Sequence, residues 1–262
     1  MNLGLLGKTA IVTGGSRGIG FAVALQLVIE GANVVICGRH EDALKDAANK
    51  IEKETQQRVL AIVADVSSKA DCEKLIKSTV AKHNRIDILI NNAGMSSTNS
   101  FMDISTRQWT EDLDLKLFGA INCSEAAVPH MEATGGGSIV NVTAISGKSS
   151  TAGTMPTSVS RAAGIALTNT MSKDLGPLSI RVNAVCIGLI RSTQIERKWK
   201  KEQALMEWED YSLLAAEQIP IPLGRIGEAS EAANAIVFLA SEAASYISGT
   251  ALNIDGGTSP VV

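Results

Sequence analysis

Several glycines recur within eight residues near the start of the chain, in the segment Thr13-Gly14-Gly15-Ser16-Arg17-Gly18-Ile19-Gly20. Residues without a Cβ let phosphate oxygens approach backbone N–H groups and the positive N-terminus of a following helix. An apolar strand-like run precedes this segment and a helical pattern follows it, which is the context that a dinucleotide-binding turn requires. We therefore expect this glycine turn (residues 14–20) to hold cofactor phosphates. The residues expected to do so are Gly14, Ser16, Arg17, Gly18, Ile19 and Gly20.

The residue that follows the second strand-like run indicates which dinucleotide is bound. An acidic side chain about 20 residues beyond the turn would accept the ribose hydroxyls of NAD(H). The chain instead reads Cys37-Gly38-Arg39-His40. Arg39 and Arg17 together can clamp a 2′-phosphate through charge-assisted hydrogen bonds. The predicted cofactor is therefore NADP(H) rather than NAD(H).

Apolar runs of strand length alternate with longer stretches of helical period along the whole chain. The runs expected to be strands are Thr9–Thr13, Asn33–Cys37, Val59–Val63, Ile86–Ile90, Ser138–Val142, Ile180–Val185 and Ala251–Ile254. The stretches expected to be helices are Ile19–Glu30, Glu41–Thr55, Lys69–His83, Thr106–Met131, Val159–Leu175 and Glu228–Ser241. This order predicts one α/β domain over residues 1–262, a Rossmann-type doubly wound parallel sheet of about seven strands with helices on both faces.

The segment at about residues 191–225 interrupts this alternation with a charged, helical stretch that ends in Ile219-Pro220-Ile221-Pro222. Insertions at the carboxyl end of such a sheet lie where ligands bind, so we interpret the segment as a substrate lid. The alternative is a pair of surface helices. Its aromatic residues, among them Trp208 and Tyr211, suggest an apolar or aromatic small-molecule substrate, although such a stripe also serves helix packing.

The chain contains four motifs of note: the glycine turn, Asp65-Val66, Asn91-Asn92-Ala93-Gly94 and the closing Asp255-Gly256-Gly257. Taken together, they resemble the classical short-chain dehydrogenase/reductases over essentially the whole chain. The resemblance implies that Asp65 and Val66 frame the adenine, that Asn92, Ala93 and Gly94 line the ribose, and that Ile190 and Ser192 contact the nicotinamide carboxamide. It also implies a homo-oligomer, a tetramer or a dimer, built on the long helices around Thr106–Met131 and Val159–Leu175.

The same resemblance predicts a divergent catalytic site. The family uses an Asn-Ser-Tyr-Lys tetrad, and the corresponding positions of this chain hold Lys116, Ala144, Thr157 and Arg161. A threonine hydroxyl is a poor proton acid, whereas Arg161 stays charged and can hold ribose hydroxyls or an anionic substrate. Burial and the nearby Arg161 would lower the pKa of Lys116, although a lysine reaching out along a helix interface is an equal alternative. The lid adds Tyr211 as a phenol.

Three functions remain open on these residues. The first is an atypical NADP(H)-dependent oxidoreductase acting on a carbonyl or alcohol, including an activated or conjugated one. The second is a cofactor-binding pseudoenzyme or regulatory subunit, favoured by an intact turn beside a replaced tetrad. The third is a non-redox lyase or isomerase with Lys116 as base and Arg161 as anion clamp. Function depends on the site rather than the fold, so the fold does not decide among them.

Composition excludes several other classes of function. The net charge is −3 and the Lys/Arg residues form no extended basic patch, which argues against a nucleic-acid partner. No apolar stretch reaches the ~20 residues that a membrane span needs. Four scattered cysteines without histidine partners at ligand spacing predict reduced thiols, no metal site and a cytoplasmic protein.

Overall fold

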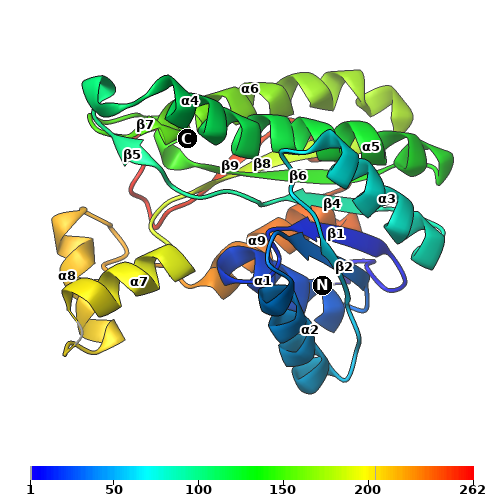
Figure 1. The fold of residues 1–262 in the computed structure, drawn as a ribbon, viewed down its shortest axis with the longest axis horizontal. Helices are drawn as coiled ribbons and strands as arrows, with labels where there is room; N and C mark the ends of the chain where they lie inside the picture. The colour runs from blue at the N-terminus through cyan, green and yellow to red at the C-terminus, as the bar shows by residue number, and fades with distance from the viewer. Residues whose placement is uncertain (1, 204) are drawn as a thin grey trace.

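A parallel sheet forms the centre of the molecule in a computed structural model that describes residues 2–203 and 205–262. The sheet has seven strands in the order β3-β2-β1-β4-β6-β8-β9 (Figure 1). The strands are β1 (Thr9–Thr13), β2 (Asn33–Gly38), β3 (Leu60–Val63), β4 (Ile88–Asn91), β6 (Gly137–Ala144), β8 (Ile180–Ile187) and β9 (Ala251–Ile254). Every adjacent pair is parallel, which confirms the predicted doubly wound sheet.

Helices cover both faces of this sheet (Figure 1). One layer contains α1 (Gly18–Ile29), α2 (Glu41–Thr55) and α9 (Ala229–Ala240), whose apolar side chains share a core cluster with alternate residues of β1, β2 and β4. The other layer contains α3 (Lys69–His83), α4 (Thr106–Leu113), α5 (Gly119–Ala133) and α6 (Thr157–Asp174). Side chains from both faces of β1 are buried, which is why that strand is continuously apolar in the sequence.

The helical stretch predicted as Thr106–Met131 is not regular throughout. It consists of α4 and α5 joined by one turn of π-helix at Asp114–Phe118. Such turns are typical of functional sites and cannot be recognised from an apolar period. The helix predicted to begin at Val159 begins at Thr157, and a short antiparallel pair, β5 (Thr98–Asn99) with β7 (Met155–Pro156), lies beside it.

The carboxyl ends of the strands meet at one edge of the sheet, where the strand order reverses between β1 and β4. This is the position at which ligands bind to open α/β sheets. The segment predicted as a lid contains α7 (Thr193–Glu202) and α8 (Trp208–Gln218), which project from this edge (Figure 1). Position 204 of that segment lies outside the described residues.

A membrane-spanning helix and a metal centre can both be looked for in the described residues. None of the helices there is long and apolar enough to cross a membrane. In the same residues no three His, Cys, Asp or Glu side chains gather closely enough to hold a metal ion.

Candidate active site

The glycine turn leaves β1 and enters α1 with two residues in the left-handed region, Gly14 (φ +65°) and Gly18 (φ +55°). A Cβ added to Gly20 would lie 2.3 Å from the carbonyl oxygen of Gly14 and 2.4 Å from Nδ2 of Asn92. The Asn92 amide donates to the carbonyl oxygen of Thr13 at 2.9 Å and to that of Gly14 at 3.3 Å. The turn is therefore held against the loop after β4, with no room for side chains where a dinucleotide backbone would lie.

The two arginines predicted to bind a 2′-phosphate both lie at the carboxyl edge of the sheet. Arg17 precedes α1 and Arg39 follows β2, and both side chains are exposed. In the part of the chain that the structure describes, neither guanidinium forms an ion pair with a carboxylate. Both remain available to a phosphate group.

The other predicted cofactor residues are divided between two regions. Asp65 and Val66 follow β3, where the Asp65 carboxylate accepts from the backbone N–H and the hydroxyl of Ser67. The backbone N–H groups of Asn92 and Ala93 both donate to the Thr13 hydroxyl, which brings the loop after β4 to the glycine turn. Asn92 and Ala93, which are predicted to line the ribose, are therefore held beside the turn.

Ile190 and Ser192 have different surroundings. Ser192 caps α7 by accepting from the backbone N–H of Ile195 at 3.4 Å. Ile190 is buried and lines a cavity of 480 Å³ together with Pro222 and Asp255. The structure therefore places the Ile190 side chain against the segment that follows α8, while Ser192 stands beside the glycine turn.

A buried polar network joins α4, the π-helical turn and α6. The Lys116 ammonium donates to the Asp112 carboxylate, which also accepts from the Ser160 hydroxyl at 2.6 Å. Lys116 also donates to Oγ1 of Thr157 at 2.7 Å. All four side chains are buried. Asp112 and Ser160 were not among the predicted site residues, although Asp112 could have been found from its spacing of four residues before Lys116, at which opposite charges meet on a helix.

The hydroxyl of Thr157 has no hydrogen-bonding capacity left in this arrangement. It accepts from Lys116 and from the backbone N–H of Ser97 at 2.9 Å, and it donates to the carbonyl oxygen of Ser97 at 2.7 Å. One donor and two acceptor positions are all that a hydroxyl offers. Thr157, the first residue of α6, is therefore bound directly to Ser97 in the loop after β4. Its hydroxyl can bind a substrate only if one of these hydrogen bonds is lost.

Arg161 lies one helical turn after Thr157 and faces the loop that follows β4. Its guanidinium donates to the carbonyl oxygen of Val142 at 2.6 Å, and Nη2 lies 2.8 Å from where a Cβ on Gly94 would be. The Nε of Arg161 is buried and has no partner among the described residues. Burial lowers the pKa of Arg161 to about 10, so the group is charged at neutral pH. It brings a fixed positive charge to the predicted ribose site.

The pKa of Lys116 is lowered to about 8. Burial is the largest cause, and the charge of Arg161 acts in the same direction, whereas the hydrogen bond from Lys116 to Asp112 raises the pKa. Lys116 is thus a buried titratable group rather than a surface lysine. Ala144, at the end of β6, contributes no polar side chain to this site.

The aromatic residues of the lid pack on one another. The rings of Trp199 and Trp208 are 5.5 Å apart, and that of Tyr211 lies 5.8 Å from Trp208. The Arg191 guanidinium lies 4.4 Å from the centre of a Trp208 ring. Trp208 and Tyr211 are buried in a cluster with Ile226. These contacts favour the packing alternative for the aromatic stripe, and burial raises the pKa of the Tyr211 phenol, which makes it a weaker acid.

Comparisons with known proteins agree over nearly the whole chain. The family model described as Enoyl-(Acyl carrier protein) reductase matches residues 14–259. A 3-oxoacyl-[acyl-carrier-protein] reductase FabG of Chlamydia muridarum is 35% identical over 98% of this chain and 99% of its own length. Solved structures of two further proteins are also similar to this chain throughout.

The first is a short-chain oxidoreductase from Pseudomonas aeruginosa PAO1, described as containing an atypical catalytic center. Its apo form is 32% identical with a TM-score of 0.95, covering 99% of this chain and 100% of that one. Its NADPH-bound form has a TM-score of 0.93 over 98% and 99% of the two chains, at 32% identity. The second is L-sorbose reductase from Gluconobacter frateurii, complexed with NADPH and L-sorbose. It is 30% identical with a TM-score of 0.93 over 100% of both chains.

Proposed function

The chain belongs to the classical short-chain dehydrogenase/reductase family, and on that premise we propose that it is an NADP(H)-dependent oxidoreductase of a carbonyl or alcohol with non-standard catalytic residues. The observation that carries the proposal is the buried Asp112–Lys116–Thr157 network beside Arg161, at the same sheet edge as a complete glycine turn. A vestigial site would not need to retain a buried ammonium beside a half-buried guanidinium, since burying charge is costly.

NADP(H) is the proposed cofactor. Arg17 in the turn and Arg39 after β2 form no ion pair with a carboxylate among the described residues, and two relatives of similar fold are described as NADPH complexes. When bound, the nicotinamide supplies or accepts the hydride. Arg161 is proposed to hold the ribose hydroxyls through the donors that the Val142 bond leaves available, and its charge favours negative charge on the substrate oxygen.

Lys116 is proposed to act electrostatically. The Lys116 side chain is buried, so water screens its charge little and the charge acts on the reacting groups by its field. By family resemblance Lys116, Ala144, Thr157 and Arg161 stand at the tetrad positions, and a tyrosine proton donor is missing from this set. Losing a general acid costs roughly 10²–10⁴-fold in rate. We therefore propose activated or conjugated carbonyls as substrates, because they need the least proton donation.

The rate of hydride transfer should depend on the charge of Lys116. A lysine is protonated below its pKa, so single-turnover oxidation of NADPH should be fast below about pH 8 and slower above it. Lys116→Arg keeps a positive charge across this range and should remove the inflection, whereas Lys116→Met should be slow at every pH. Stopped-flow absorbance at each pH measures the rates. An unchanged inflection in Lys116→Arg would assign the titration to another group.

A cofactor-binding pseudoenzyme is the second candidate, favoured by the fully hydrogen-bonded hydroxyl of Thr157. The same experiment separates the two. Tight NADPH binding without hydride transfer across a broad panel of activated carbonyls would support the pseudoenzyme and exclude the oxidoreductase.

A homo-oligomer, a dimer or a tetramer, is also proposed. Phe118 on the π-helical turn and Val159 on α6 are 48% and 45% exposed, and both belong to the helices expected to pack between subunits. Apolar side chains left on a protein surface favour such contacts. Light scattering of the purified protein measures the assembly.

A further inference from the structure

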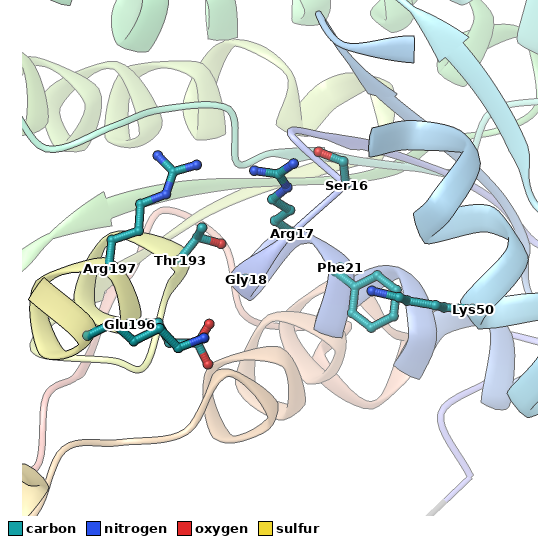
Figure 2. Close-up of a pocket in the computed structure, with 9 residues that line it drawn as sticks. Ser16, Arg17, Gly18, Phe21, Lys50, Thr193, Glu196 and Arg197 are labelled. Carbon is teal, nitrogen blue, oxygen red and sulfur yellow. The ribbon is translucent and has the colours of Figure 1, made fainter. Parts of the chain in front are cut away.

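A cavity of 430 Å³ lies between the glycine turn and the lid helix α7 (Figure 2). It is lined by Ser16, Arg17, Gly18, Phe21, Lys50, Thr193, Glu196, Arg197 and Lys200. The lining comes from the turn, α1, α2 and α7, so this cavity exists only because the lid lies against the dinucleotide-binding half of the sheet. Arg39, the other predicted phosphate ligand, is not part of this lining.

The charges around the cavity are strongly unbalanced. Arg17, Lys50, Arg197 and Lys200 contribute four cations, and Glu196 is the acid in the lining. The Glu196 carboxylate already pairs with Nε of Arg191 at 3.0 Å. Within residues 2–203 and 205–262, none of the four cations forms an ion pair with a carboxylate. Four like charges around one cavity repel one another and attract a multiply charged anion.

The lid helix begins directly against the turn. A Cβ on Gly18 would lie 3.7 Å from the backbone nitrogen of Thr193, the first residue of α7. Arg197 and Lys200 follow Thr193 by four and seven residues, so the three share one face of the helix. Figure 2 shows Arg197 and Arg17 on either side of Thr193. The cationic face of α7 is thereby presented to the turn.

The start of α7 is also hydrogen-bonded to the loop after β4. The backbone N–H of Ser96, in the loop after β4, donates to the Gln194 side chain at 3.1 Å, and Gln194 donates back to the Ser96 carbonyl oxygen at 3.3 Å. Helix α7 therefore contacts the glycine turn and the loop after β4 at once. A ligand bound at the cationic face of α7 would therefore lie close to both the glycine turn and the loop after β4.

We propose that the lid is part of the cofactor site: Arg197 and Lys200 of α7 bind phosphate groups of the cofactor together with Arg17. This inference rests on the proposed NADP(H) dependence and adds residues to it that lie outside the dinucleotide-binding half. The phosphate supplies the counter-charge that the cavity lacks. In this arrangement the cofactor phosphates hold α7 against the turn.

Isothermal titration with NADP⁺ and NAD⁺ tests the proposal without any turnover. Arg197→Ala and Lys200→Ala should each weaken NADP⁺ binding about tenfold, the usual effect of losing one charge-assisted hydrogen bond. Arg197→Lys should retain most of the affinity. Lys198→Ala is the matched control, because Lys198 lies on the same helix, pairs with Glu202 at 3.9 Å and does not line the cavity.

Comparing NADP⁺ with NAD⁺ shows which phosphate group of the cofactor the lid cations bind. A loss confined to NADP⁺ assigns the lid cations to the 2′-phosphate, and an equal loss for both nucleotides assigns them to the diphosphate; each supports the proposal. Wild-type affinities in Arg197→Ala and Lys200→Ala overturn it. If Arg17→Ala is weakened in that case, the cofactor assignment survives and only the role of the lid is lost. The proposed NADP(H) dependence itself fails if the wild type binds NADP⁺ no more tightly than NAD⁺.

Discussion

Asp112→Asn is expected to lower the free energy of unfolding by about 3 kcal/mol, because it leaves the buried ammonium of Lys116 without its carboxylate. The same change should lower the pKa of Lys116 below its value of about 8, since burial and Arg161 still act while the contribution of Asp112 that raises the pKa is gone. Urea denaturation at neutral pH measures the first effect. The inflection of single-turnover rate against pH measures the second, and it should move to lower pH.

The control for Asp112→Asn lies one residue earlier on the same helix. Glu111 is exposed and pairs with Arg107 at 3.5 Å, so Glu111→Gln should change the free energy of unfolding by less than about 1 kcal/mol. The double variant Asp112→Asn with Lys116→Met should recover part of the lost stability, because it removes both buried charges. If Asp112→Asn were no more damaging than Glu111→Gln, the buried pair would not be an energetic unit.

Gly20→Ala is the second change expected to have a large effect. Its new Cβ would lie 2.3 Å from the carbonyl oxygen of Gly14, and relief requires the backbone of the turn to move away from Asn92. Overpacking of this kind costs about 1–3 kcal/mol of stability. Losing even one hydrogen bond to a phosphate, worth about 1.5–3 kcal/mol, would weaken NADP⁺ binding roughly 10- to 100-fold.

Thermal unfolding and calorimetric titration of Gly20→Ala measure these two losses. Gly176→Ala is the comparison, because an added Cβ there meets no described atom within 4 Å and the position is far along the chain from the turn. It should bind NADP⁺ like the wild type. Normal affinity in Gly20→Ala as well would mean that the close approach of the turn to Asn92 is unimportant for the cofactor.

The order of the residues in the sequence was enough to predict the sheet and the glycine turn. Parallel strands buried on both faces carry continuous apolar runs, as Ala10–Val12 and Ile88–Ile90 do, and positive φ angles at Gly14 and Gly18 favour glycine. These are local requirements, so they leave a mark on neighbouring residues. The π-helical turn at Asp114–Phe118 leaves no comparable mark, because a single turn of altered hydrogen-bond spacing is too short to set a recognisable period of its own.

The environment of each site residue was decided only by tertiary structure. From the sequence, Lys116 could equally be a surface lysine or a buried group, and Thr157 could be a free hydroxyl. Packing of α4 against α6 buries Lys116 between Asp112 and Thr157. Pairing of β5 with β7 brings Ser97 to Thr157, whose hydroxyl is then fully hydrogen-bonded by Ser97 and Lys116. Tertiary structure also places Arg197 and Arg17 in the lining of one cavity. Composition and spacing determine which groups are present, whereas pKa values and hydrogen-bond partners depend on distances between segments far apart in the chain, which only the folded sheet and its lid establish.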